Sequence, residues 1–223
     1  MNKKTLLIML LLALIAPLAA NAQSTLTVCD GEITNEYIPV YGYYADTEGT
    51  NSEFIIPSSE LTAMNGMSIT AMSFYISSPA DDAWGATFQV YMKEVEETTF
   101  SEINGPAGCT VVYTGVLDGT GETMDVTFDD DYTYHGGNLL IGTYVTSAGD
   151  LKSASFYGIE ATEAAYCDID GGYDFEVDFL PKTTFTYQEP ASCPKPTGLA
   201  VNSSVVTAVA TWQGDAETYN IDI

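Results

Sequence analysis

Acidic loops carry the side chains best suited to metal chemistry in this sequence. The segment DIDGGYD places Asp168, Asp170 and Asp174 around two adjacent glycines. Calcium prefers oxygen ligands from carboxylates, backbone carbonyls and water, and the loops of a β-sandwich supply such groups. The segment lacks the EF-hand spacing and its closing glutamate, and acidic loops in a highly charged protein are often simply solvated. Calcium binding and a solvated turn therefore both remain open for these residues.

Three tyrosines are the first candidates for ligand binding. Tyr37, Tyr41 and Tyr43 fall on one face of EYIPVYGYY if this segment is a strand, and Pro39 on that face favours a sheet edge. A sugar ring presents an apolar face that stacks on an exposed aromatic ring, while its hydroxyls bond to carboxylates and amides. Tyrosines repeated at period two more often cover a core, so both roles stay open.

Trp84 is the second candidate for a sugar-binding platform. It follows Asp81 and Asp82 in an expected loop, so an aromatic ring would stand beside hydrogen-bonding groups. A tryptophan at the start of a strand also often packs under its own loop. We keep Trp84, Asp81 and Asp82 as candidate ligand-binding residues.

Catalytic signatures are missing from this sequence. His135 is the single histidine and lies in the turn segment YHGGN, and no GxSxG nucleophile motif is present. A serine or cysteine triad needs a base and an orienting carboxylate arranged in space. Zinc binding is not expected, because zinc sites use histidine and thiolate ligands and the chain has too few of either. We therefore expect a binding protein with no catalytic residues.

The N-terminus predicts export. Two lysines precede the run TLLIMLLLALIAPLAA, and the small residues of ANA at 20–22 suit a signal peptidase. We predict a signal peptide at residues 1–22 and a mature chain from Gln23. Since a cleavage pattern rather than a basic flank follows the run, no transmembrane segment is expected after cleavage. The predicted location is secreted or on the cell surface.

The charge balance argues against nucleic acid as a partner. The chain has 31 Asp and Glu against 6 Lys and Arg, for a formal net charge of −25. Lysine and arginine bind phosphate backbones, and a surface this acidic repels them. It repels anionic lipid for the same reason.

Disulfides are expected in an exported chain with four cysteines. Their spacing includes no CxxC motif, and an even number in an oxidising compartment indicates pairing. We predict Cys109 with Cys167, and Cys29 with Cys193 because the terminal strands of a sandwich often lie side by side. The other connectivities stay open.

Alternating apolar residues predict strands in much of the chain. Phe88, Val90 and Met92 fall on one face of ATFQVYMKEV, and TMDVTFDD alternates in the same way. MSITAMSFYI changes phase between Ile69 and Met72, which indicates a bulge or a strand covered on both sides. NLLIGTYV is apolar nearly throughout and predicts a central buried strand. Only PSSELTAM indicates a helical turn, with Ser58 or Ser59 as its N-cap.

The fold class predicted from these segments is all-β. Many short strands separated by Gly- and Pro-rich turns favour an antiparallel two-sheet sandwich, jelly-roll-like, over residues 23–187. Residues 188–196 are rich in proline and predict a linker.

The last segment, residues 197–223, resembles the start of a fibronectin type III domain. The resemblance depends on the PxxL motif at 196–199, on Trp212 and on YNI at 219–221. Such a sandwich needs more strands than this segment supplies, so we expect a truncated domain and further domains downstream.

The main segment resembles β-sandwich modules that precede fibronectin type III repeats in exported proteins of Bacteroidetes-type bacteria, akin to jelly-roll adhesin modules. The blocks that carry the resemblance, in order, are NEYIPVYGYYAD, SEFIIPSSEL, NGMSITAMSFYISSP, FQVYMKEVEETTF, YHGGNLLIGTY and FLPKTTFTY. The resemblance implies a surface-displayed module that binds glycans or glycoproteins without catalysis. The alternatives are an accessory domain of a secreted protease or glycosidase and a structural spacer without a ligand.

Overall fold

The computed structural model describes residues 23–190, 197–203 and 208–213. The chain divides into two compact units between Gln188 and Glu189. The predicted signal peptide lies outside the described residues, as does most of the predicted linker. The first unit contains every residue proposed above for ligand or calcium binding.

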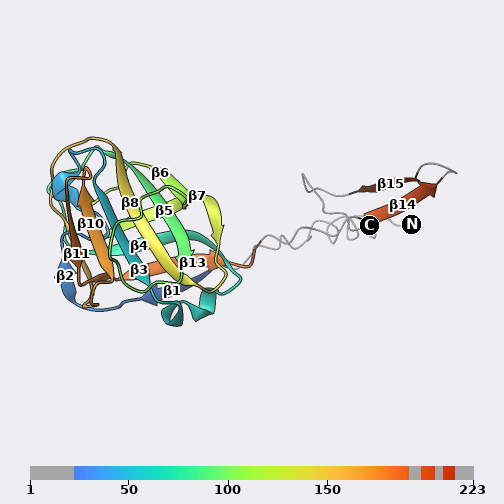
Figure 1. The fold of residues 1–223 in the computed structure, drawn as a ribbon, viewed down its shortest axis with the longest axis horizontal. Helices are drawn as coiled ribbons and strands as arrows, with labels where there is room; N and C mark the ends of the chain where they lie inside the picture. The colour runs from blue at the N-terminus through green and yellow to red at the C-terminus, as the bar shows by residue number, and fades with distance from the viewer. Residues whose placement is uncertain (1–22, 191–196, 204–207, 214–223) are drawn as a thin grey trace, which may run out of the picture. The chain divides into compact units, whose positions relative to one another are not determined.

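One sheet of the first unit has seven strands, all paired antiparallel (Figure 1). Five strands lie side by side in the order β1, β13, β4, β9 and β12, while β7 pairs with β4 and β2 pairs with β9. Their bounds are β1 Ser24–Val28, β2 Ile33–Asn35, β4 Ser68–Ser78, β7 Thr123–Thr133, β9 Ser155–Ile159, β12 Leu180–Pro181 and β13 Thr183–Gln188.

The second sheet has six strands in the order β11, β10, β3, β8, β5 and β6, again all antiparallel. Its outermost strands, β11 and β6, are therefore far apart across the sheet. The bounds are β3 Asn51–Ile56, β5 Thr87–Val95, β6 Thr110–Gly115, β8 Asn138–Ser147, β10 Ala165–Ile169 and β11 Tyr173–Val177.

A hydrophobic core joins the two sheets and confirms the predicted sandwich. Phe54 of β3 meets Phe74 of β4 edge to face, with ring centroids 6.0 Å apart. The alternation predicted for β5 is confirmed, because Phe88, Val90 and Met92 are buried in this core. Non-directional apolar burial of this kind is the main favourable term in folding.

The expected irregularity in MSITAMSFYI is a bulge. The register between β4 and β13 shifts here, because Ala71 pairs with Thr186 and Ile69 pairs with the next residue, Tyr187, which leaves Thr70 as an extra residue in β4. The extra residue returns Met72 to the core face, and both Ile69 and Met72 are buried. The phase change in the sequence therefore corresponds to an actual feature of the sheet.

The only helical segments among the described residues are short 3-10 turns: η1 Gly42–Tyr44, η2 Ser58–Glu60 and η3 Thr62–Met64. The helical turn predicted in PSSELTAM corresponds to η2 and η3. The expected serine N-cap is wrong, since Pro57 precedes η2 and no side chain caps the turn.

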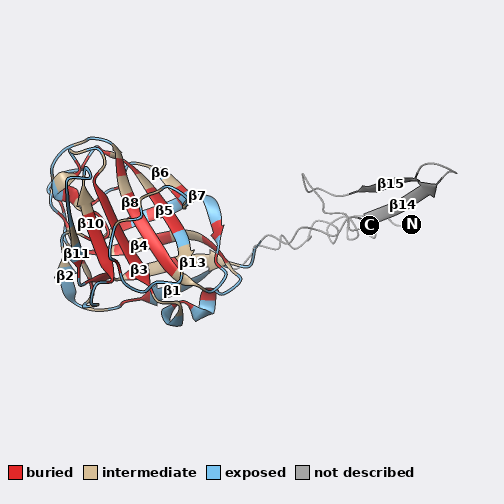
Figure 2. Cartoon of the chain, in the orientation of Figure 1, coloured by how far each residue is buried: buried red, intermediate tan, exposed pale blue. Residues whose placement is uncertain are grey.

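Strand β3 is buried on both faces (Figure 2). Phe54 and Ile56 belong to the core between the sheets, whereas Ile55 belongs to a second cluster on the outer face of the six-stranded sheet. The segment of residues 96–109 between β5 and β6 supplies the cover for that face, and we call it the cover loop. Its Phe100 packs with Ile55 and Leu140 in the second cluster.

The predicted Cys109–Cys167 disulfide does not form in this structure, where both thiols are free. Cys167 points into the core between the sheets, while Cys109 packs against the outer cluster. Three strands separate β10 from β6, a distance of roughly 19 Å at the usual strand spacing. Disulfide geometry requires the two Cα atoms to lie within about 7 Å. The other predicted pair links the buried Cys29 to Cys193, which lies outside the described residues.

The second unit contains one antiparallel pair, β14 Thr197–Ser203 with β15 Ala208–Gln213. These strands fall in the segment that resembles a fibronectin type III domain. The assignment to that family stays a prediction.

The sandwich predicts a large stability cost for Phe54→Ala. Because Phe54 is fully buried between the sheets, its truncation should lower the free energy of unfolding by about 3–5 kcal/mol, measured by denaturant titration. The matched control, Val116→Ala, removes an exposed side chain and should change it by less than about 0.5 kcal/mol. Equal effects of the two variants would contradict the packing described.

Candidate functional site

Six aromatic rings form a continuous surface feature that we call the aromatic strip. Its successive ring contacts have centroid separations between 4.9 and 5.5 Å, and edge-to-face geometry dominates. Tyr43 and Tyr173, on opposite sides of the strip, are 44% and 65% exposed. In order of contact, the members are Tyr173, Phe175, Tyr37, Tyr41, Tyr44 and Tyr43.

The segment between β2 and β3 places the tyrosines of the strip. Ile38 and Val40 are buried in the core, which leaves the tyrosines that flank them on the solvent side. The segment starts with a turn in which Asn35 Oδ1 accepts hydrogen bonds from the backbone N–H groups of Tyr37 and Ile38. The predicted strand is wrong, because bends and η1 occupy this stretch. The predicted grouping of Tyr37, Tyr41 and Tyr43 holds, since their rings contact one another in series.

Tyr41 is the most crowded ring of the strip. It contacts Tyr37, Tyr43, Tyr44 and Phe175. Burial is the main cause that raises the pKa of Tyr41 to about 12, followed by the neighbouring tyrosines and by Glu36. The Tyr41 phenol is therefore neutral at physiological pH and able to donate a hydrogen bond.

Trp84 is fully buried, so the proposal that it forms an exposed platform is wrong. Its indole Nε1 donates a hydrogen bond to the backbone oxygen of Lys152 at 2.6 Å, and its ring packs against Phe88. Gly42 of η1 lies directly on the indole, where a Cβ atom would clash. Trp84 thus contacts both the 150–153 segment and η1 from the core side and links them.

Lys152, whose backbone oxygen accepts the hydrogen bond from Trp84, also lines a surface groove of about 450 Å³. We call it the end groove. Tyr43 of the strip and Asp81 both line it, whereas the sequence had placed Asp81 beside Trp84. Asp82 does not line the groove, and its carboxylate accepts a hydrogen bond from the backbone N–H of Ala83. The lining residues are Tyr43, Ser78, Pro79, Asp81, Leu151, Lys152 and Ser153.

The acidic turn between β10 and β11 contains the predicted calcium ligands. Asp168 and Asp174 are paired directly across the two strands, and Asp170 lies at the turn with a positive φ of 51°. Burial, with a smaller contribution from Asp174, raises the pKa of Asp168. Asp174 accepts a hydrogen bond from the Tyr166 hydroxyl at 2.7 Å. Within residues 23–190, no three His, Cys, Asp or Glu side chains gather closely enough to hold a metal ion.

His135 is an exposed turn residue. Its Nδ1 lies 3.0 Å from Glu94 Oε1. Burial raises the pKa of Glu94, but hydrogen bonds from the backbone N–H groups of Gly137 and His135 outweigh it, so the net shift is downward. These contacts link the β7–β8 turn, which contains His135, to Glu94 of β5.

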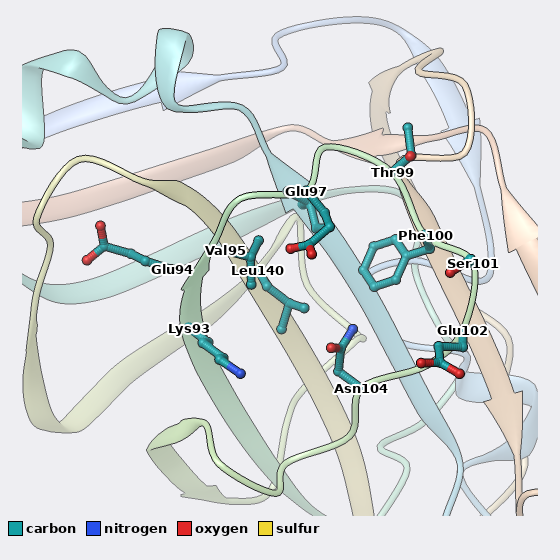
Figure 3. Close-up of a pocket in the computed structure, with 11 residues that line it drawn as sticks. Lys93, Glu94, Val95, Glu97, Thr99, Phe100, Ser101, Glu102, Asn104 and Leu140 are labelled. Carbon is teal, nitrogen blue, oxygen red and sulfur yellow. The ribbon is translucent and has the colours of Figure 1, made fainter.

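A second hollow lies under the cover loop and was not expected from the sequence (Figure 3). This cavity, of about 290 Å³, has the apolar side chains of Ile55 and Leu140 beneath it and Phe100 as a wall. No local motif marked it, because it depends on a loop folding back over a distant strand. We call it the covered cavity.

Comparison of the chain with protein families, with curated proteins and with solved structures finds no match. The resemblances to an adhesin-like module and to a fibronectin type III domain therefore stay predictions. In the part of the chain that the structure describes, no helix is both long and apolar enough to cross a membrane.

The buried position of Trp84 predicts that Trp84→Ala destabilises the fold. We expect a loss of about 3–5 kcal/mol in the free energy of unfolding, measured by denaturant titration, because a large core side chain and a buried hydrogen bond are both removed. Tyr43→Ala should cost much less, since that ring is 44% exposed. The reverse order of the two effects would contradict the placement of Trp84.

The raised pKa of Tyr41 predicts a loss of stability at alkaline pH. In the unfolded chain this phenol loses its proton near pH 10, whereas in the folded chain the pKa is about 12. The stabilising contribution is therefore complete below pH 10 and is lost as the pH rises toward 12. Tyr41→Phe should make this decline shallower in denaturant titrations between pH 9 and pH 12. An unchanged slope would show that Tyr41 is not involved.

Proposed function

We propose that this chain is an exported, non-catalytic module that binds neutral glycans through the aromatic strip and the end groove. The single observation that carries the proposal is the strip itself, in which six rings contact one another in series and Tyr43 and Tyr173 are substantially exposed. The two end rings are exposed and the four rings between them are partly buried, so apolar surface remains accessible along the strip, and such patches mark interaction sites. Stacking on the apolar face of a sugar ring suits such a surface.

The end groove supplies polar groups beside the rings. Asp81 is able to accept hydrogen bonds from sugar hydroxyls, and Ser153 and Lys152 are able to donate them. Tyr43 lines the groove and belongs to the strip, so one ligand can contact both. Rings for stacking and a few convergent polar groups are the combination expected of a sugar site.

The charge of the chain favours neutral over acidic glycans. With a formal net charge of −25, the protein repels sulfated or sialylated sugars at long range. Lysines are few, and Lys152 is the single cationic residue that lines the end groove. A neutral glycan avoids this repulsion while keeping the stacking contacts.

Calcium binding at the β10–β11 turn is a secondary part of this proposal. Like charges directly opposite in a β-ladder are destabilising, and Asp168 faces Asp174 in this way. A bound cation would relieve the repulsion and fix the turn that precedes Tyr173, with backbone carbonyls and water as further ligands because no three acidic side chains gather there. Glycan binding is measured in calcium and again in chelator, which tests the calcium site separately from the aromatic strip.

The main test measures glycan binding by the full chain and its variants. A panel of neutral and acidic oligosaccharides is titrated calorimetrically against wild type and Tyr43→Ala/Tyr173→Ala. At least one neutral glycan should bind the wild type, and the double variant should weaken that binding about tenfold, because each aromatic contact contributes about 0.5–1.5 kcal/mol.

Val116→Ala is the matched control for this test. Val116 is 54% exposed and follows β6, at the edge of the six-stranded sheet opposite β11. It should leave glycan binding unchanged. If neither neutral nor acidic glycans bind the folded wild type, the proposal fails, and the module is a spacer or the accessory domain of a hydrolase. Preferential binding of acidic glycans would overturn the argument from charge.

A further inference from the structure

The covered cavity is independent of the glycan site proposed above. It lies on the outer face of the six-stranded sheet, whereas the end groove is lined by η1 and loops. Figure 3 shows the Phe100 ring, Leu140 and the Asn104 amide around its centre, with Glu97 and Glu102 on either side of the ring. Apolar walls with a few polar groups are typical of small-ligand sites.

Glu53 holds the roof of this cavity in place. Its fully buried carboxylate accepts hydrogen bonds from the backbone N–H groups of Asn104 and Gly105, at 2.8 and 2.6 Å, and from Asn104 Nδ2 at 3.2 Å. The Tyr91 hydroxyl donates to Glu53 as well and lies 2.7 Å from Asn51 Oδ1. Burial, and then the Glu53 carboxylate, raise the pKa of Tyr91 well above its usual value, so the phenol keeps the proton that it donates. The cover loop is thus fixed before any ligand arrives.

The orientation of Asn104 gives the cavity a fixed hydrogen-bond acceptor. Because its Nδ2 donates to Glu53, its Oδ1 is the atom left for a ligand, and the amide faces the centre of the cavity (Figure 3). The exposed Glu97 and Glu102 supply two further acceptors, since within residues 23–190 their carboxylates form neither an ion pair nor a hydrogen bond. Lys93 is the one cationic residue of the lining, and these two carboxylates outnumber it. Glu94 contributes little, because it points away from the centre and its oxygens bond to His135 and Gly137.

We propose that the covered cavity binds a primary ammonium group carried on a short apolar stem. An ammonium has three donors and no acceptor, which matches the acceptors of Glu97, Glu102 and Asn104. The methylene groups of the stem pack on Leu140, Ile55 and the Phe100 ring. A free alkylamine and a lysine side chain of another protein share this chemistry.

The test follows the backbone amide signals of the cover loop by NMR while the full chain is titrated with two probes. One probe is n-butylamine, and the other is a Gly-Lys-Gly peptide with both ends blocked. We expect saturable shifts at Phe100, Asn104 and Gly105 with at least one probe. Stronger binding of the peptide assigns the site to lysine side chains, and stronger binding of butylamine assigns it to free amines. No saturable shift with either probe would overturn the proposal.

Two double variants separate a specific site from general attraction of a cation to an acidic protein. Glu97→Gln/Glu102→Gln should raise the Kd of the better probe about tenfold or more, because two charge-assisted hydrogen bonds weaken. Glu122→Gln/Glu160→Gln removes the same charge from exposed positions outside the cavity and should leave the Kd unchanged. Equal weakening by both pairs would overturn the proposal.

Discussion

The burial of β3 on both faces is the constraint on which the rest of the first unit depends. One face of the strand contributes Phe54 and Ile56 to the core between the sheets, and the other carries Ile55 and the carboxylate of Glu53. A buried carboxylate is costly unless its oxygens are hydrogen-bonded. The cover loop meets this requirement with backbone N–H groups, so the strand and the loop stabilise each other. The covered cavity is a consequence of that arrangement.

The aromatic strip depends on a similar division between buried and exposed side chains. Between β2 and β3 the aliphatic residues point into the core, and the tyrosines beside them come to the surface. Trp84 supports the neighbouring loops from inside through its hydrogen bond to Lys152 and its contact with Gly42. Trp84, a candidate ligand-binding residue in the sequence, therefore has a structural role, and tyrosines provide the exposed rings.

Local periodicity predicted strands such as β4, β5 and β8, but it failed for EYIPVYGYY and did not predict the contacts between distant segments. The alternation in β5, the phase change in β4 and the buried centre of β8 were all visible in the sequence, because each depends on which face of one strand is apolar. The burial of Glu53 was not visible, since it depends on a loop some fifty residues away in the chain. The wrong pairing of Cys109 with Cys167 has the same origin, because the strand order within a sheet does not follow from cysteine spacing.

The central claim is that the rings of the aromatic strip stack against sugar, and saturation-transfer NMR tests it most directly. Aromatic protons of the full chain are saturated in the presence of a neutral oligosaccharide, and the transfer to each sugar proton is recorded. We expect the strongest transfer to the C–H protons on one face of a sugar ring, and its loss in Tyr43→Ala/Tyr173→Ala. Transfer of equal strength in that variant, or no transfer to any neutral glycan, would contradict it.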